Sequence, residues 1–141
     1  MFGRGITAED AALILVDTSV IVAWLDRDHT HHNACTAALD RASQTDELAI
    51  STVTYAELAS GARTREYVDE QLSIFRRAPL DAESAWRAGV VFRQYRPAKG
   101  EHEPVLPDFF IHAQALVHSW PHLTNDRRRT KVWAGLDWIW P

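Results

Sequence analysis

Hydrophobic positions along the chain form short continuous runs and longer segments with helical spacing. Residues 13–16 are four large apolar residues in a row, which predicts a strand buried on both faces, as in parallel sheets. Residues 48–51 and 122–125 predict two further strands, and residues 133–141 predict a closing turn and a last strand. The predicted helices are 20–25, 32–43, 53–63, 66–77, 82–95 and 106–117. Strands that alternate with helices indicate an α/β protein with a doubly wound parallel sheet.

Two of these predicted helices can be tested in detail. In residues 66–77 the apolar side chains recur at helical spacing, and Pro79 is expected to end the helix. In residues 82–95 the amphipathic pattern places Trp86 and Tyr95 on the side that faces the core.

Composition bounds the class of protein. The chain has 141 residues, enough for one domain with its own core, and we expect that domain at residues 13–141, after a loose leader at residues 1–12. Fifteen basic and 19 acidic residues give a net charge of −4, which excludes an overall basic character. Cys35 is the only cysteine, which excludes an internal disulfide and a cysteine-rich zinc site. A single cysteine suits a reducing compartment, so we expect a cytoplasmic protein. No apolar run is long enough to span a bilayer, so we expect no membrane contact.

Two acidic residues directly follow predicted strands. Asp17 follows the first strand, and Thr18 and Ser19 after it can begin a helix by accepting backbone hydrogen bonds. Asp126 follows the strand at residues 122–125. Open α/β sheets bind ligands outside the carboxyl ends of their strands, so both acids are candidates for a functional site. The alternative for Asp17 is that it only caps the helix.

Two more acidic residues lie on predicted helices. Glu57 is the only charged side chain on a helix face of small and apolar residues, where a carboxylate is costly to bury without a partner or a cation. The alternative is that Glu57 turns outward and pairs with Arg63 or Arg65. Asp108 follows Pro107 at the start of a helix, where it is either a candidate ligand or a helix cap.

These four acids are expected to converge, because parallel strands place their carboxyl ends along one edge of the sheet. Crowded carboxylates raise one another's pKa unless a divalent cation neutralises them. Oxygen ligands without a set of cysteines favour a hard ion, Mg²⁺ or Mn²⁺. Such an ion activates water and stabilises the leaving oxygen of a phosphodiester, so the predicted reaction is metal-assisted phosphodiester hydrolysis.

Histidines add further candidates. His29, His31 and His32 form a cluster that suggests a metal site, although histidines in a polar turn are more often solvated. His112 lies four residues after Asp108 on the same helix face, where it either reaches the site or packs in the core.

Basic residues near the acids are candidates for substrate binding. Arg127 and Arg128 belong to a basic run that directly follows Asp126, where a phosphate-bearing substrate could contact them. Arg96 belongs to a small basic cluster that precedes Asp108. The alternative is that these charges only form a solvated face.

Four motifs, LVDTSV, TVTYAEL, LPDFFIHAQAL and LTNDRR, resemble in their order those of the PIN-domain nucleases, most closely the VapC-type toxins of bacterial toxin–antitoxin pairs. The resemblance extends from residue 13 to residue 141. It implies a PIN-like three-layer sandwich, in which helices flank a five-stranded parallel sheet. It also implies roles for six residues: Asp17, Glu57, Asp108 and Asp126 as acidic metal-binding and catalytic residues, and Ser19 and Thr124 as supporting hydroxyl residues.

The same resemblance implies a Mg²⁺-dependent endoribonuclease, with Mn²⁺ as a substitute ion, that cleaves tRNA, ribosomal RNA or mRNA. It implies neutralisation by a VapB-like antitoxin and a homodimer. Residue 112 is usually small in similar proteins, so we expect His112 to donate a hydrogen bond to a carboxylate or to the scissile phosphate. Three alternatives stay open: a PIN nuclease of RNA maturation or DNA flaps, a metal-dependent RNA-binding regulatory module without catalysis, and a phosphoryl-transfer enzyme with Asp17 as nucleophile.

Overall fold

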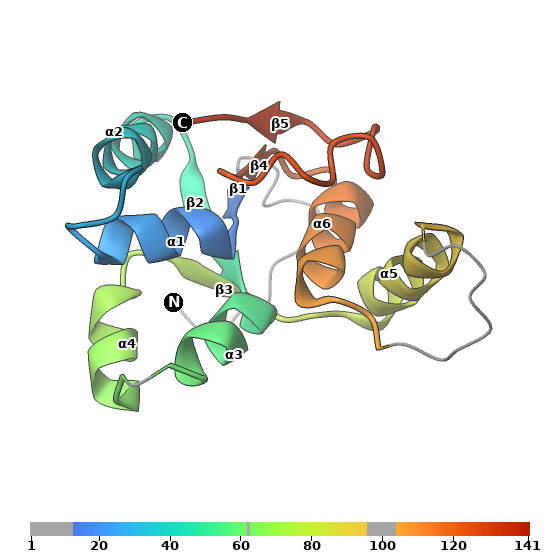
Figure 1. The fold of residues 1–141 in the computed structure, drawn as a ribbon, viewed down its shortest axis with the longest axis horizontal. Coiled ribbons are helices and arrows are strands. Elements are labelled where there is room, and N and C mark those ends of the chain that lie inside the picture. Colours follow the sequence, from blue (N-terminus) through green and yellow to red (C-terminus); the bar gives the residue numbers. More distant parts are fainter. Residues whose placement is uncertain (1–12, 62, 96–103) are drawn as a thin grey trace.

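A computed structural model of the chain describes residues 13–61, 63–95 and 104–141. The predicted leader, residues 1–12, lies outside the described residues, and so does Arg96. The described part is a five-stranded sheet with helices on both sides (Figure 1). The predicted α/β fold, with a five-stranded parallel sheet between layers of helices, is confirmed.

All neighbouring strands of the sheet are parallel. The strands are β1 (Leu13–Val16), β2 (Glu47–Ser51), β3 (Arg76–Ala78), β4 (His122–Leu123) and β5 (Trp138–Ile139). They lie in the order β3-β2-β1-β4-β5, so the direction of winding reverses between β1 and β4. A crevice opens at such a reversal, outside the carboxyl ends of the two strands, and ligands of α/β proteins bind there.

Helices cover both faces of the sheet. In the described residues they are α1 (Thr18–Leu25), α2 (His32–Ser43), α3 (Thr52–Ala59), α4 (Arg65–Gln71), α5 (Ala82–Tyr95) and α6 (Pro107–His118). None of these helices is both long enough and apolar enough to cross a membrane.

The two hydrophobic cores follow from the alternation of side chains along β1. Ile14 and Val16 pack in a cluster with side chains of α1 to α4, whereas Leu13 and Leu15 pack in a cluster with side chains of α5 and α6. Successive side chains of a strand point to opposite faces, so a wholly apolar strand is covered on both sides. Figure 1 shows the two groups of helices on either side of the sheet.

Polar residues at the strand ends begin the helices that follow. The side chain of Asp17 accepts a hydrogen bond from the backbone N–H of Ser19 at 3.1 Å and caps α1. Ser51 caps α3 in the same way, accepting from Val53 at 3.0 Å. Thus the turns at the carboxyl ends of β1 and β2 place polar side chains at the edge of the sheet where the crevice lies.

The predicted helix at residues 66–77 is wrong in its second half. Helix α4 ends at Gln71, and Arg76–Ala78 is the edge strand β3. Val68, Leu72 and Phe75 are buried and fit the spacing of a helix, which explains the error. The strand itself is short and carries two arginines, so no apolar run indicated it.

The predicted buried side of α5 is also wrong. Its buried residues are Ser84, Ala88 and Phe92, whereas the side chain of Trp86 is 72% exposed and Tyr95 is also exposed. Ser84 and Ala88 are small and lie four residues apart, so this face can approach a neighbouring helix closely. The large aromatic rings were therefore a misleading guide to the inner face.

Candidate active site

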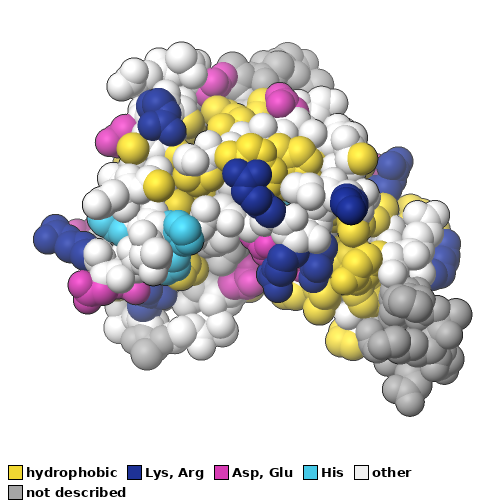
Figure 2. All heavy atoms as spheres, turned by 45° about the horizontal axis from the view of Figure 1, so that its top comes forward, with side chains coloured by type: hydrophobic (Ala, Val, Ile, Leu, Met, Phe, Trp, Pro, Cys, Tyr) yellow, Lys and Arg dark blue, Asp and Glu magenta, His cyan; other side chains and the backbone are white. Residues whose placement is uncertain are grey.

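An open pocket lies at the carboxyl ends of β1 and β4, and all four predicted acids line it: Asp17, Glu57, Asp108 and Asp126. They come from separate elements, namely the turn after β1, helix α3, the first turn of α6 and the turn after β4. The structure therefore brings together residues that are far apart in the sequence. Figure 2 shows Lys or Arg side chains directly beside a group of acidic side chains on one face of the molecule.

Asp17 is the most buried of the four acids, with 5% of its surface exposed. Its Oδ2 accepts the capping hydrogen bond from Ser19, and its Oδ1 lies 3.4 Å from Nε2 of His122. Burial by itself raises the pKa of Asp17, but His122 and Ser19 favour the charged form more strongly and hold the pKa well below its usual range. Asp17 is therefore both a helix cap and a member of the pocket whose charged form is favoured.

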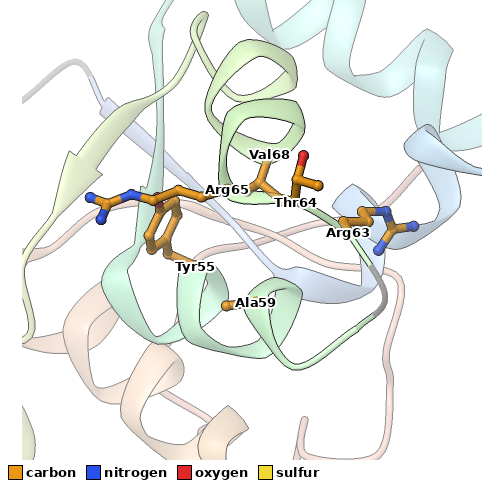
Figure 3. A pocket seen from close by; sticks show the side chains of 6 residues that line it. All are labelled: Tyr55, Ala59, Arg63, Thr64, Arg65 and Val68. Atoms are coloured by element: carbon orange, nitrogen blue, oxygen red, sulfur yellow. The ribbon is translucent and has the colours of Figure 1, made fainter.

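Glu57 projects from α3 toward the same pocket. The hydroxyl of Thr18 donates a hydrogen bond to Oε1 of Glu57 at 2.7 Å and lies 2.9 Å from the hydroxyl of Thr54. Burial, reinforced by the other carboxylates of the pocket, raises the pKa of Glu57 despite this hydrogen bond. The alternative, an ion pair of Glu57 with Arg63 or Arg65, is not seen among the described residues. These two arginines line a different pocket, between α3 and α4 (Figure 3).

Asp108 lies in the first turn of α6 and faces the guanidinium of Arg129. Nε of Arg129 lies 3.0 Å from Oδ2 of Asp108, close enough for an ion pair but without hydrogen-bond geometry. Burial raises the pKa of Asp108, and Arg129 only partly offsets this effect. The guanidinium also lies over the ring of Tyr95, 5.2 Å from its centroid.

Asp126 is held by Arg128. The side chain of Arg128 donates hydrogen bonds to both carboxylate oxygens at 2.6 to 3.0 Å, and its backbone N–H donates to Oδ1 at 2.9 Å. These hydrogen bonds lower the pKa of Asp126. Arg128 is therefore at the pocket, as expected for a substrate-binding residue, but in this conformation it is engaged by Asp126.

The hydroxyl groups of Ser19 and Thr124 join the turns after β1 and β4. Their oxygens lie 3.3 Å apart, the backbone N–H of Asn125 donates to Ser19 at 3.0 Å, and the backbone N–H of Asp126 donates to Thr124 at 3.1 Å. These contacts fix the position of Asp126 relative to Asp17. They suit the supporting role that was expected of both hydroxyl residues.

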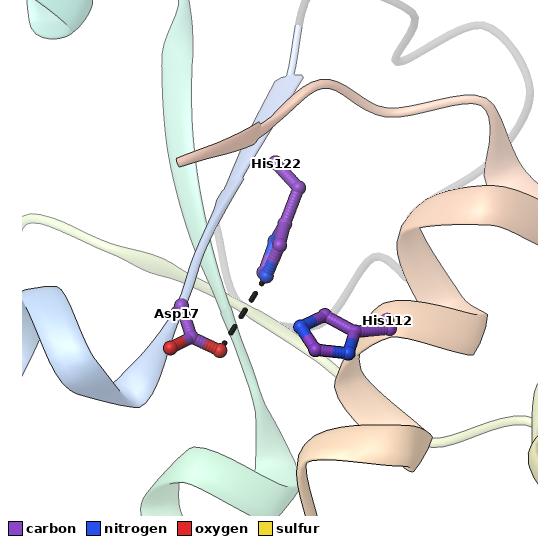
Figure 4. Close-up of side chains that lie close together, drawn as sticks. All are labelled: Asp17, His112 and His122. Carbon is purple, nitrogen blue, oxygen red and sulfur yellow. Dashed lines mark ion pairs between the residues drawn. The ribbon is translucent and has the colours of Figure 1, made fainter. Parts of the chain in front are cut away.

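Two histidines lie behind Asp17, in the core. Nδ1 of His122 lies 3.0 Å from the carbonyl oxygen of Leu15, and the ring of His112 lies edge-on to that of His122 with the centroids 5.1 Å apart. Figure 4 shows both rings directed toward the carboxylate of Asp17. Among the described residues no hydrogen bond joins His112 to an acid, and its buried Nδ1 has no partner. The predicted hydrogen bond from His112 stays a prediction.

Sequence reasoning missed His122. The signal was a histidine inside a segment predicted to be a buried strand, because a polar side chain in such a strand needs a partner. Its partner, Asp17, lies more than a hundred positions earlier in the chain, and the pairing of β1 with β4 brings the two residues together.

The remaining predicted residues lie at varying distances from the acids. His29 lines the pocket, whereas His32 places its Nδ1 2.9 Å from the carbonyl oxygen of Ala23. Arg127 is exposed, and its guanidinium lies over the ring of Trp140, 4.0 Å from the centroid. The histidine cluster in the polar turn is therefore not a single site.

The acidic pocket fits a hard divalent cation. The raised pKa values of Glu57 and Asp108 express first the cost of burying these carboxylates and second the repulsion from neighbouring carboxylates, and at Asp108 the arginines offset this only in part. Several carboxylate oxygens that face one open space are the ligands that Mg²⁺ and Mn²⁺ prefer. We therefore regard this pocket as a candidate metal centre that is open to a substrate.

Comparison with known proteins agrees with this geometry. Residues 14–133 match the PIN domain family. The chain is similar to the crystal structure of VapBC2 from Rickettsia felis bound to a DNA fragment from its promoter, with a TM-score of 0.71 and 18% identity over 92% of this chain and 98% of that chain. It is also similar to a toxin–antitoxin complex from Klebsiella pneumoniae, with a TM-score of 0.60 and 26% identity over 89% of this chain and 95% of that chain.

A third similar structure is FitAcB from Neisseria gonorrhoeae, with a TM-score of 0.60 and 25% identity over 90% of this chain and 95% of that chain. Among curated proteins, no match was found. The similarity spans nearly the whole of each of these chains. The match to the PIN domain family, over residues 14–133, includes all four acids.

Proposed function

The chain belongs to the PIN domain family, and from this premise we propose that it is a Mg²⁺-dependent endoribonuclease toxin of the VapC type. The observation that carries the proposal is the single pocket lined by four carboxylates at the reversal point of the sheet. Asp17, Glu57, Asp108 and Asp126 would hold the ion, and Mn²⁺ would substitute for Mg²⁺. When bound, the ion supplies positive charge that activates water and stabilises the leaving oxygen of a phosphodiester.

The residues of the chain itself position this chemistry. Burial opposes the charge of Asp17, but the hydrogen bond that its carboxylate accepts from the backbone N–H of Ser19 favours the ionised form. Ser19 and Thr124 hold the two turns that carry Asp17 and Asp126. The pocket is open on one side, so a bent single strand of RNA can place one phosphate over the acids.

Arginines next to the acids suit a substrate phosphate. Arg128 and Arg129 bind Asp126 and Asp108 in the free protein. A cation at the carboxylates would compete with these arginines and release them. A guanidinium released at the edge of the pocket is placed to bind the phosphates of tRNA, ribosomal RNA or mRNA, and the exposed Arg127 is a further candidate for such contacts.

We propose a VapB-like antitoxin as the protein partner, because one similar solved structure is a toxin–antitoxin complex. The pocket between α3 and α4 is lined by Tyr55, Ala59, Val68 and the basic side chains of Arg63 and Arg65 (Figure 3). An apolar floor with a basic edge suits a peptide that carries both apolar and acidic residues. With an RNA substrate and such a partner, the protein would act in the cytoplasm, and we propose a homodimer as its assembly.

Expression in a bacterial host tests this function. Induction of the wild-type chain should arrest growth and produce new RNA 5′ ends at discrete positions. Both effects should disappear in Asp108→Asn, persist in the exposed control Asp40→Asn, and be suppressed by co-expression of the neighbouring open reading frame. RNA that is bound but not cut would instead support an RNA-binding regulatory module. Cuts without growth arrest would support a nuclease of RNA maturation.

A further inference from the structure

The buried imidazole of His122 has a nitrogen that the hydrogen bonds of the structure leave unused. Its Nδ1 lies 3.0 Å from the carbonyl oxygen of Leu15. A carbonyl only accepts, so Nδ1 carries the proton, and in a neutral ring Nε2 has a free lone pair. That Nε2 is fully buried, has no hydrogen-bond partner among the described residues and lies 3.4 Å from Oδ1 of Asp17. Two electron-rich atoms therefore face each other unless a positive charge lies with them.

His112 brings a second imidazole to the same place. Only 2% of its surface is exposed, and Figure 4 shows its ring directed toward Asp17 and His122. Its Nδ1 is buried and has no hydrogen-bond partner among the described residues, so this ring can offer a nitrogen to a ligand. One ligand atom from each of the three residues can be chosen so that all three atoms lie within 4.8 Å of one another.

We propose that Asp17, His112 and His122 form a site for a divalent transition metal of the Zn²⁺ class, behind the acidic pocket. Two imidazoles and one carboxylate are ligands that Zn²⁺ and Co²⁺ accept readily, whereas Mg²⁺ prefers oxygen ligands. The hydrogen bond from Nδ1 of His122 to a backbone carbonyl is the outer contact that orients metal-bound histidines.

To bind one ion, the three side chains must move slightly closer together. An ion about 2.0 to 2.1 Å from each ligand needs ligand separations of about 3.3 Å, so side chains that now lie within 4.8 Å would approach by up to about 1.5 Å. The rings of Trp133 and Trp138 pack against His112, with centroids 5.9 and 5.4 Å away. Such an aromatic shell limits access of water and strengthens the attraction between the ion and its ligands.

The site shares Asp17 with the acidic pocket but does not depend on the proposed nuclease activity. Asp17 lines the open pocket, and the two histidines lie on its inner side (Figure 4). An ion that enters the pocket therefore meets Asp17 before the imidazoles. The rival explanation is a protonated His122 that pairs with Asp17 without any metal.

Titration of the purified full chain with Co²⁺ tests the proposal, with Mg²⁺ in excess to saturate the carboxylate pocket. We expect one Co²⁺ per chain, with an absorption spectrum of nitrogen coordination, displaced by Zn²⁺ and not by Mg²⁺. His112→Leu and His122→Leu, which preserve side-chain volume, should each weaken binding at least about tenfold, since loss of an outer contact alone costs that much. The controls His31→Ala, in the exposed histidine cluster, and Asp108→Asn should bind Co²⁺ as the wild type does.

Three outcomes would overturn the proposal: no Co²⁺ binding by the folded wild-type chain, equal binding by both leucine variants, or loss of binding in His31→Ala. If a leucine variant fails to fold, nuclear magnetic resonance of the wild type labelled with ¹⁵N-histidine decides the matter. Zn²⁺ should then shift the imidazole nitrogens of His112 and His122, and unchanged resonances would refute the site. Because Asp108→Asn is expected to lose cleavage and keep Co²⁺, failure of this site is distinguishable from failure of the proposed function.

Discussion

Replacement of Arg129 by methionine removes the cation that faces Asp108 while it keeps much of the apolar volume. Nε of Arg129 lies 3.0 Å from Oδ2 of Asp108, and the two side chains are only 12% and 23% exposed. Burial already raises the pKa of Asp108, and Arg129 opposes this effect. Without the guanidinium, the carboxylate must either take up a proton or stay charged beside the other acids of the pocket.

The magnitude follows from the partial burial of this pair. Removal of one partner of a fully buried ion pair costs about 3 to 5 kcal/mol, because a buried charge is left alone. Asp108 keeps some exposure, which reduces this cost to about 2 kcal/mol, and the lost contact of the guanidinium with the Tyr95 ring adds about 0.5 kcal/mol. We expect Arg129→Met to lower the free energy of unfolding by about 2 to 3 kcal/mol at pH 7 in the presence of a chelator.

Urea denaturation with and without Mg²⁺ measures this effect. Mg²⁺ should restore part of the stability of Arg129→Met and should stabilise this variant more than the wild type, because no arginine competes with the ion for Asp108. The matched control is Arg65→Met, which removes an exposed arginine from a 3.6 Å ion pair and should leave the free energy of unfolding unchanged. Equal stability of wild type and Arg129→Met, or a loss that Mg²⁺ does not reduce, would refute the reasoning.

Three further predictions concern other parts of the site and the fold. Ser19→Ala removes the acceptor of the Asn125 N–H and should lower the free energy of unfolding by about 1 to 2 kcal/mol and weaken Mg²⁺ binding, both measured by denaturation with and without the ion. The pKa of Glu57 is raised by folding, so at a pH above the pKa of the unfolded chain the charge of Glu57 destabilises the fold. Glu57→Gln should therefore raise the melting temperature at pH 7 in the absence of metal. The same variant should be stabilised less by Mg²⁺ than the wild type. Burial alone would raise the pKa of Asp81, but hydrogen bonds with His118 and within the turn lower it to about 2. The stability that ionised Asp81 contributes is therefore complete above its unfolded pKa and is lost as the pH falls toward 2. Melting temperatures measured from about pH 5 to about pH 2 should fall less steeply in Asp81→Asn than in the wild type.

The sequence was informative wherever hydrophobic pattern and turn chemistry coincide. The run before Asp17 is apolar on both faces and ends in residues that cap a helix, so one segment indicated a strand, its burial and the place of a ligand. The four acids could be selected from the sequence by their places in the predicted elements. Two follow strands, one begins a helix, and one lies on the apolar face of a helix. That they line one pocket depends on the order of the strands, which the α/β pattern restricts strongly.

Long-range pairing limited what the sequence could show. Strand β3 forms by pairing with β2, and its two arginines lack the apolar pattern that predicts a strand. In α5 the buried face includes the small residues Ser84 and Ala88, so the hydrophobic pattern wrongly predicted that the exposed Trp86 is buried. His122 pairs with Asp17 only through the contact of β4 with β1. Arg128 was expected near a substrate, but only the structure shows that Asp126 holds it and that Arg129 faces Asp108.

Cleavage of RNA by the purified chain, free of any partner, tests the central claim most directly. Labelled total RNA would be incubated with Mg²⁺, with Mn²⁺ or with a chelator, beside Asp108→Asn and the exposed control Asp40→Asn. If the four carboxylates form one catalytic cation site, the wild type and Asp40→Asn cut RNA at discrete positions with either ion, and the chelator and Asp108→Asn abolish the cuts. Cleavage that persists in the chelator or in Asp108→Asn, or RNA left intact by a folded wild-type chain with both ions, would contradict the account.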